Sequence, residues 1–221
     1  MSRAEDVAKR VQDTLSTDDR TLVVVAGANG AGKSTFVDTF VRPTGIRIVN
    51  PDQIARALAP GDPGTMAYEA AQAAETVRQD LVARGLSFCM ETVFSDPKGA
   101  KVAFLRRARL EQRYVVLLVF IGLDSSQLAV ARVFERVESG GHDVPDDKIA
   151  SRFPRTLENL TQALEFVDHA FVFDNSSADE PFRFVAEFGN GALVQRGTYR
   201  PTWTIPLFKA FPKSVGNQWL V

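Results

Sequence analysis

The feature that most constrains this fold is a glycine-rich octet between an apolar run and the start of a helix. Residues 21–27 read TLVVVAG and residues 27–34 read GANGAGKS. The octet satisfies the pattern GxxxxGK[ST], after a strand and before a helix as that pattern requires. The alternative, a glycine-rich turn without chemical use, is disfavoured because motif and context agree. The sequence therefore predicts a phosphate-binding loop.

Such a loop turns successive backbone N–H groups and a helix N-terminus toward one anion. Lys33 is expected to reach the β- and γ-phosphates of ATP, and Ser34 is expected to hold Mg²⁺. The residues expected to bind ATP are Gly27, Ala28, Asn29, Gly30, Ala31, Gly32, Lys33, Ser34 and Thr35.

Further apolar runs alternate with helical patterns, at residues 46–50, 86–92, 114–123 and 169–175. This order indicates an α/β fold in which crossover helices cover both faces of a parallel sheet. Residues 182–197 read FRFVAEFGNGALVQRG and predict a hairpin around residues 189–191. The tail that follows is expected to pack across the sheet. Pro154 makes an uninterrupted helix over residues 146–167 unexpected.

The composition is that of one globular domain: 221 residues, 45% apolar and 24% charged. We expect a core over residues 1–176, with a lid around 132–155, and a hairpin and tail over 177–221. Lys and Arg number 26 against 27 Asp and Glu, which gives no excess of positive charge for nucleic acid or a membrane surface. The amphipathic N-terminus does not resemble a signal peptide, so a cytoplasmic location is expected. A lone Cys89 excludes a disulfide within one chain.

Two functions compete for a phosphate loop in this context: an ATPase that drives motion in a partner, and a kinase. Residues 138–143, ESGGHD, and 170–177, AFVFDNSS, superficially match the signature sequence and second Walker strand of a transporter-type ATPase. However, Pro145 interrupts the helix that should follow the signature, and Asn175 stands where a hydrolase carries glutamate. These departures favour a kinase.

A kinase needs a carboxylate that orients the acceptor hydroxyl, and polar residues of this kind follow the second strand-like run. Asn50 and Asp52 lie where ligands bind in open α/β sheets, at the carboxyl end of a strand. Asp52 is expected to accept the hydroxyl proton or orient the hydroxyl; the alternative is that Asp52 only caps the helix that follows.

The third strand-like run ends in Glu91 and Thr92. A carboxylate in an apolar run is expensive to bury unless it is paired, so Glu91 is expected to face the phosphate, the metal or a polar substrate, with a structural ion pair as the alternative. Glu75, on the preceding helix, belongs either to the site or to the solvated face of that helix.

Arg132 and Arg136 stand one helical turn apart before Gly140 and Gly141, and Arg152 and Arg155 follow. This spacing suits a lid that folds guanidinium groups over a phosphate. A surface salt bridge is the alternative for any one of them.

Together these motifs resemble the zeta toxin family of small P-loop kinases, in its short chromosomal form. The resemblance covers about residues 20–176 and rests on AGANGAGKST, VNPDQIA, SFCMETVFS, AFVFDNS and, most tellingly, GGHDVP followed by IASRFPR. It implies the fold of nucleoside-monophosphate kinases with sheet order 2-3-1-4-5. Its best-known members use ATP and Mg²⁺ to phosphorylate the amino-sugar 3′-hydroxyl of UDP-N-acetylglucosamine and are restrained by an antitoxin.

By this resemblance Lys33 matches the phosphate-loop lysine and Asp52 the base. Glu75, Glu91 and Thr92 match substrate-contacting positions. Arg136 and Arg152 match the lid and transition-state arginines, with Arg132 or Arg155 as alternatives. The expected function is that of an ATP-dependent kinase of a nucleotide-like metabolite. A kinase of another nucleotide or metabolite, and a non-catalytic ATP-binding switch, remain the alternatives.

Overall fold

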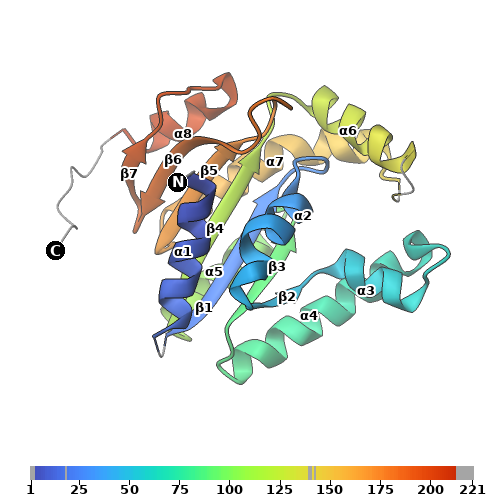
Figure 1. The fold of residues 1–221 in the computed structure, drawn as a ribbon, viewed down its shortest axis with the longest axis horizontal. Helices are drawn as coiled ribbons and strands as arrows, with labels where there is room; N and C mark the ends of the chain where they lie inside the picture. Colours follow the sequence, from blue (N-terminus) through green and yellow to red (C-terminus); the bar gives the residue numbers. More distant parts are fainter. Residues whose placement is uncertain (1–2, 18, 139–140, 142, 213–221) are drawn as a thin grey trace.

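The computed structural model describes residues 3–17, 19–138, 141 and 143–212, in which strands and helices alternate (Figure 1). The strands are β1 (Arg20–Gly27), β2 (Arg47–Val49), β3 (Phe88–Thr92), β4 (Tyr114–Gly122), β5 (His169–Asp174), β6 (Arg183–Gly189) and β7 (Ala192–Arg196). The helices are α1 (Arg3–Leu15), α2 (Lys33–Phe36), α3 (Pro51–Leu58), α4 (Ala67–Ala83), α5 (Ala100–Leu110), α6 (Ser126–Glu138), α7 (Asp146–Leu164) and α8 (Ile205–Ala210). A π-helical turn, Val37–Val41, continues α2.

The seven strands form one sheet in the order β2-β3-β1-β4-β5-β6-β7. The first five strands in this order are parallel, and β6 and β7 are antiparallel additions at one edge. The predicted α/β fold, with its 2-3-1-4-5 core and C-terminal hairpin, is confirmed. In this order β1 lies between β3 and β4, so Val25 pairs with Glu91 on one side and with Val119 on the other. The carboxyl ends of these parallel strands therefore lie side by side along one border of the sheet, the border at which β1, β3 and β4 end.

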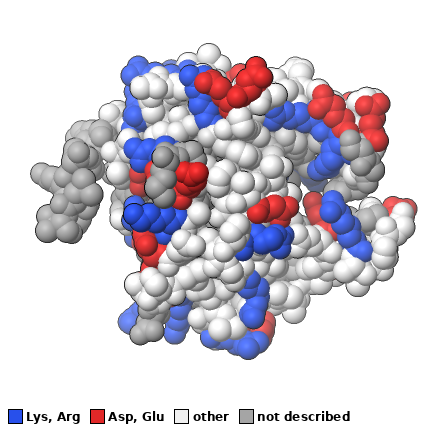
Figure 2. All heavy atoms as spheres, in the orientation of Figure 1, with Lys and Arg blue, Asp and Glu red and all other residues white. Residues whose placement is uncertain are grey.

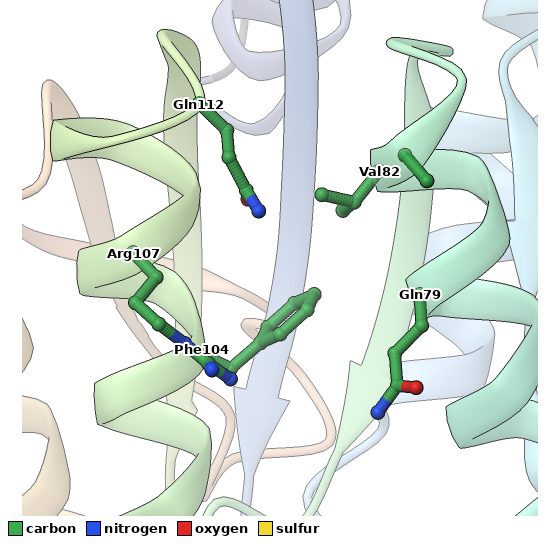
Figure 3. Close-up of a pocket in the computed structure, with 6 residues that line it drawn as sticks. Gln79, Val82, Phe104, Arg107 and Gln112 are labelled. Atoms are coloured by element: carbon green, nitrogen blue, oxygen red, sulfur yellow. The ribbon is translucent and has the colours of Figure 1, made fainter.

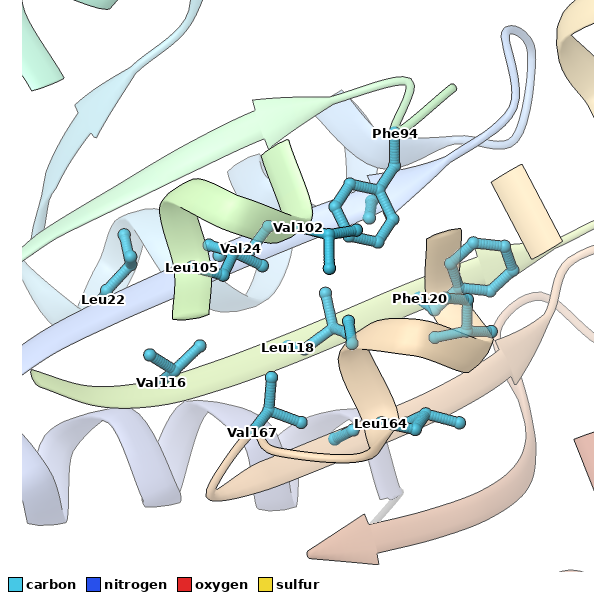
Figure 4. Close-up of a cluster of buried hydrophobic side chains, with 14 of the residues drawn as sticks. Leu22, Val24, Phe94, Val102, Leu105, Val116, Leu118, Phe120, Leu164 and Val167 are labelled. Atoms are coloured by element: carbon cyan, nitrogen blue, oxygen red, sulfur yellow. The ribbon is translucent and has the colours of Figure 1, made fainter. Parts of the chain in front are cut away.

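Alternate residues of the central strands face two separate apolar cores, because successive side chains of a strand point to opposite faces. Leu22 and Val24 belong to the core beneath α4, α5 and α7, part of which Figure 4 shows. Val23 and Val25 belong to the core that α1, α2 and α6 cover. Both faces of the parallel strands are buried, which explains their continuous apolar sequence.

The C-terminal segment extends the sheet and then crosses its end. Asn190 and Gly191 have φ angles of 51° and 79°, the left-handed conformation that a tight hairpin turn requires. The Trp203 ring lies on Gly122, where an added methyl group would come within 2.2 Å of the ring, and Leu207 is fully buried. Residues 213–221 of the predicted tail lie outside the described residues.

The prediction that Pro154 precludes an uninterrupted helix was wrong. Helix α7 runs through Pro154 from Asp146 to Leu164. Pro154 is exposed, so water can hydrogen-bond to the carbonyl oxygen of Ala150 that a proline leaves without its usual N–H donor.

On the face shown in Figure 2, acidic side chains lie beside basic ones rather than forming a large area of one sign. Arg42 and Asp38, whose side chains come within 2.7 Å of each other, form an exposed ion pair. Among the described residues, no helix combines the length and apolarity needed to cross a bilayer.

Candidate active site

The phosphate loop joins β1 to α2 and lies against α6 and the end of β5. Gly30 and Gly32 have φ angles of 72° and 90°, which L side chains rarely adopt. A methyl group on Gly30 would lie 2.8 Å from the Ala129 carbonyl oxygen of α6, and one on Gly32 would lie 2.6 Å from Asn175 Nδ2. Backbone conformation and close packing therefore both require glycine at these two positions.

Lys33 opens α2, and its Nζ donates to the Ala28 carbonyl oxygen across the loop over 2.8 Å. The pKa of Lys33 is lowered to about 8, mainly by burial and to a smaller extent by the positive charge of Arg136. The carboxylates of Glu91 and Asp52 act in the opposite direction. All three of these charged side chains thus act on the ammonium group that the motif places nearest to the phosphates.

Glu91 links the phosphate loop to the second strand. Its Oε2 accepts from the Ser34 hydroxyl over 2.9 Å, and its Oε1 accepts from Asn50 Nδ2 over 2.5 Å. Burial raises the pKa of Glu91, while the Ser34 hydroxyl, the Lys33 charge and the Asn50 amide oppose that rise. Glu91 is 8% exposed and both of its carboxylate oxygens have donors, so hydrogen bonds compensate for the burial.

Ser34 and Glu91 have the chemistry of a magnesium site. Mg²⁺ prefers oxygen ligands, and here a hydroxyl and a carboxylate oxygen lie 2.9 Å apart at the start of the helix that follows the phosphate loop. Within the described residues, no group of three or more His, Cys, Asp or Glu side chains offers an all-protein metal cage. This donor set fits an ion that completes its coordination with phosphate oxygens and water.

Asp52 lies in the first turn of α3 and is exposed. The alternative in which Asp52 caps this helix is wrong, because Asn50 is the cap: its Oδ1 accepts from the Asp52 backbone N–H over 2.8 Å. The Asp52 carboxylate is consequently available to a ligand. Its charge acts on both Lys33 and Glu91, which places it on the side of the phosphate loop.

Glu75 and Thr92 have partners of their own. Arg78 Nη2 and Lys101 Nζ contact Glu75 Oε2 over 2.6 and 3.0 Å. Although burial opposes it, these two cations lower the pKa of Glu75 to about 2. Thr92 Oγ1 accepts from the Phe94 backbone N–H over 3.1 Å and shapes the loop after β3.

The four arginines occupy different positions. Arg136 acts electrostatically on Lys33, whereas Arg132 donates to the carbonyl oxygens of Asn175 and Ser176 over 2.5 and 3.3 Å. Arg155 Nε donates to the Ser95 carbonyl oxygen over 2.9 Å. Arg152 is half-buried on α7 and pairs with no carboxylate in the part of the chain that the structure describes.

A family model described as an AAA domain matches residues 22–158, more than half of the chain. The chain belongs to this family. The matched region begins in β1 and includes the phosphate loop, Asp52, Glu91 and the arginines of α6 and α7. This AAA domain is thus the part of the chain that carries all the candidate site residues.

Among solved structures, a chain of the AvrRxo1-ORF1:-ORF2 complex with ATP is 18% identical, with a TM-score of 0.62 over 85% of this chain and 64% of that chain. This chain thus spans less than two thirds of that chain's length. A chain of the PezAT chromosomal toxin–antitoxin system of Streptococcus pneumoniae is 14% identical, with a TM-score of 0.56 over 85% of this chain and 82% of that chain. At these identities the similarity shows a shared P-loop fold.

An uncharacterized protein of Haemophilus influenzae is 27% identical to this chain over 131 residues. These residues make up 59% of this chain and 91% of that protein.

Residues 170–174, which superficially match the second Walker strand of a transporter-type ATPase, form part of β5, after the end of the AAA domain. Strand β4 separates β5 from β1, and Asp174 accepts from Trp203 Nε1 and the Ser176 hydroxyl over 2.7 and 2.9 Å. The strand beside β1 is β3, whose Glu91 contacts Ser34. In the sequence, the feature that indicates Glu91 as a site residue is an isolated carboxylate within an apolar run.

Two surface hollows lie away from the phosphate loop. One, of about 310 Å³, lies between α4 and α5, where Gln79 and Val82 face Phe104, Arg107 and Gln112 (Figure 3). The other, of about 640 Å³, lies between α6 and α7 beside the exposed ring of Phe134. The candidate site is instead the edge of the sheet at which β1, β2 and β3 end.

Proposed function

We propose that this AAA domain is an ATP-dependent kinase that transfers the γ-phosphoryl group to a hydroxyl of a small nucleotide-like metabolite. One observation carries the proposal: Glu91 joins Ser34 of the phosphate loop to Asn50, the residue that precedes α3 and Asp52. This connection supports the proposal that an anion-binding loop, a magnesium-compatible pair and a solvent-accessible carboxylate act together at one edge of the sheet. Phosphoryl transfer requires these three parts.

Each side chain has a role in this proposal. Lys33 exchanges its bond to the Ala28 carbonyl for phosphate oxygens. Ser34 and Glu91 would hold Mg²⁺, which would neutralise charge on those phosphates when bound. Asp52 orients the acceptor hydroxyl and takes its proton as the new O–P bond forms and the bond to the β-phosphate oxygen breaks. Arg136 and Arg152 stabilise the charge of the transferring group.

UDP-N-acetylglucosamine is the first acceptor to test, because the sequence resembles the zeta toxins. An antitoxin-like partner that covers the phosphate pocket belongs to the same proposal. The PezAT chain, which has the same fold, comes from a toxin–antitoxin system. Co-purification with the product of a neighbouring small reading frame tests this partner, and free passage of that product through a column of the immobilised protein would count against it.

The kinase test incubates purified protein with labelled ATP, Mg²⁺ and either UDP-N-acetylglucosamine or a metabolite extract, and identifies the labelled product by mass. Lys33→Ala is expected to reduce kcat/KM by roughly 10²- to 10³-fold, and Asp52→Asn by roughly 10²- to 10⁴-fold. Lys9→Ala and Asp80→Asn, which change exposed residues on α1 and α4, are the matched controls.

The outcomes separate the alternatives. A labelled product other than phosphorylated UDP-N-acetylglucosamine would show that the acceptor is a different metabolite, and the proposal that the protein is a kinase would stand. Tight ATP binding with no acceptor-dependent ADP release would instead support the ATP-binding switch. Near wild-type turnover by Asp52→Asn would remove this carboxylate from the mechanism.

A further inference from the structure

The buried amide of Asn175, directly after β5, connects the phosphate loop to the C-terminal hairpin. Its Nδ2 donates to the Ala31 carbonyl oxygen over 2.9 Å, and its Oδ1 accepts from the Phe182 backbone N–H over 3.2 Å. Asn175 is 8% exposed, so both bonds are shielded from water. One side chain therefore couples two segments far apart in the sequence.

The bond to Ala31 constrains the neighbouring Gly32 N–H, because a peptide unit is planar. The carbonyl of residue 31 and the N–H of residue 32 belong to the same trans peptide and point in opposite directions. Holding the Ala31 oxygen toward Asn175 therefore directs the Gly32 N–H away from it. The anion-binding property of such loops comes from N–H groups aligned in this way.

Phe182 adds a second contact between the hairpin and the loop region. Its φ angle is 53°, an uncommon backbone conformation for a bulky residue, and it immediately precedes β6. Its ring packs edge-on against Phe36 of α2 at a centroid distance of 5.2 Å. A methyl group on Gly32 would lie 3.5 Å from the same ring.

The same segment also anchors α6. Arg132 Nη1 donates to the carbonyl oxygen of Asn175, and its Cβ would lie 3.2 Å from a methyl group on Gly30. In this arrangement the Arg132 guanidinium is engaged by backbone carbonyls rather than directed to a phosphate. Arg132 thus supports the phosphate loop from α6 while Asn175 supports it from β5.

We propose that Asn175 is a positioning residue that holds the Gly32 N–H in its anion-binding orientation, so that nucleotide binding and docking of the β6–β7 hairpin stabilise each other. The coupling is reciprocal, because a ligand that favours the ordered loop must also favour the contacts that order it. This inference rests on the proposed function only in taking ATP as the ligand of the loop.

The test measures the Kd for ATP with Mg²⁺ by calorimetry. Asn175→Ala removes both side-chain bonds, whereas Asn175→Asp keeps an acceptor for Phe182 and removes the donor to Ala31. Each is expected to weaken ATP binding by about tenfold or more, the effect of losing one buried hydrogen bond. In a kinase assay, kcat at saturating ATP is expected to stay within about threefold of wild type while the KM for ATP rises, because the loss is one of binding.

Ser177 supplies matched controls, because it lies in the same loop and its Oγ accepts only from the backbone N–H groups of Asp179 and Glu180 among the described residues. Ser177→Ala is expected to bind ATP within about twofold of wild type, since it leaves Asn175 intact. Ser177→Asp measures how much an added negative charge alone weakens binding. If the inference holds, Asn175→Asp weakens ATP binding more than Ser177→Asp does.

Amide hydrogen exchange of the nucleotide-free variants distinguishes a role in positioning the phosphate loop from a general contribution to stability. Asn175→Asp is expected to speed exchange at Ala31, whose N–H donates to the Ala28 carbonyl oxygen within the loop, and to leave the hairpin protected, whereas Asn175→Ala should loosen both. Unchanged Ala31 exchange together with wild-type ATP affinity in both variants would overturn the inference. If the wild type binds no ATP, this inference and the proposed function both fail. If it binds ATP and phosphorylates no acceptor, only the kinase proposal fails.

Discussion

At the scale of single residues, Lys33 and Glu91 are a buried cation and a buried carboxylate, whose charges suit the binding of a phosphate and its metal ion. Burial lowers the pKa of Lys33 to about 8 and raises that of Glu91. Each group partly restores the charged form of the other, Asp52 acts on both groups, and Arg136 acts on Lys33. A triphosphate with its metal would add charge of both signs to this partly desolvated cluster, so protonation and binding must be linked.

ATP affinity is therefore expected to depend on pH above about 8. The Lys33 pKa is lowered in the free protein, so Lys33 is protonated below about 8 and loses its proton above it, whereas phosphate binding requires the ammonium form. Kd should then rise by up to about tenfold per pH unit between pH 8 and 10. Calorimetry at pH 8.5 in two buffers with different ionisation heats should detect proton uptake.

Lys33→Arg is the control for this pH dependence, because guanidinium stays charged throughout the range. A wild-type affinity that stays constant from pH 8 to 10 would contradict a lowered Lys33 pKa.

At the scale of secondary structure, helix ends and an interior proline shape the region around the site. Asn50 caps α3 and simultaneously donates to Glu91, so one side chain fixes both the helix start and the site carboxylate. Ser125 Oγ accepts from the Leu128 N–H at the start of α6. Helix α7 instead tolerates Pro154 in its interior, two residues after Arg152. Its course past Arg152 is therefore set by packing on the sheet rather than by helix propensity.

Pro154→Ala is expected to raise the free energy of unfolding by about 1–3 kcal/mol, because proline removes one hydrogen bond of the helix and its ring crowds the carbonyl of Ala150. Urea unfolding followed by circular dichroism measures the change. Ser151→Ala, an exposed position on the same helix, is the matched control. A loss of stability in Pro154→Ala would mean that the packing of α7 on the sheet depends on the proline.

At the scale of the whole molecule, the C-terminal segment completes the sheet and covers its end. Trp203 lies on Gly122 at the end of β4 and donates to the buried carboxylate of Asp174 over 2.7 Å. The Phe211 ring packs on Phe188 of β6 at a centroid distance of 5.4 Å. Trp203 on Gly122, Asn175 at Ala31 and Phe182 on Phe36 connect the region after β5 to the AAA domain at three points.

Trp203→Ala is expected to lower the free energy of unfolding by about 2–4 kcal/mol, since it removes a large packed ring and the donor to Asp174. Trp203→Phe keeps most of the ring and should lose about 1–3 kcal/mol, because Asp174 is left with one donor fewer. Urea unfolding followed by far-ultraviolet circular dichroism measures both. Equal stability of wild type and Trp203→Ala would show that this segment does not contribute to the fold.

The sequence by itself determined the parallel core, the phosphate loop and the hairpin. Each rests on local information: continuous apolar runs, glycines at fixed spacing, and a turn pattern between two β-rich arms. It also identified Asp52 and Glu91 as polar residues at strand ends, because a carboxylate beside an apolar run is unusual whatever the fold.

The resemblance to the zeta toxins implied which strand lies beside β1, but only the tertiary structure decided that Glu91 accepts from both Ser34 and Asn50. It also assigned Glu75 to an ion pair with Arg78 and Lys101, and Arg132 to the carbonyl of Asn175. These partners lie 3 to 57 residues apart along the chain. The physical reason is that strand order and side-chain pairing depend on how the whole chain minimises its exposed apolar surface and unpaired polar groups, which no short stretch of sequence records.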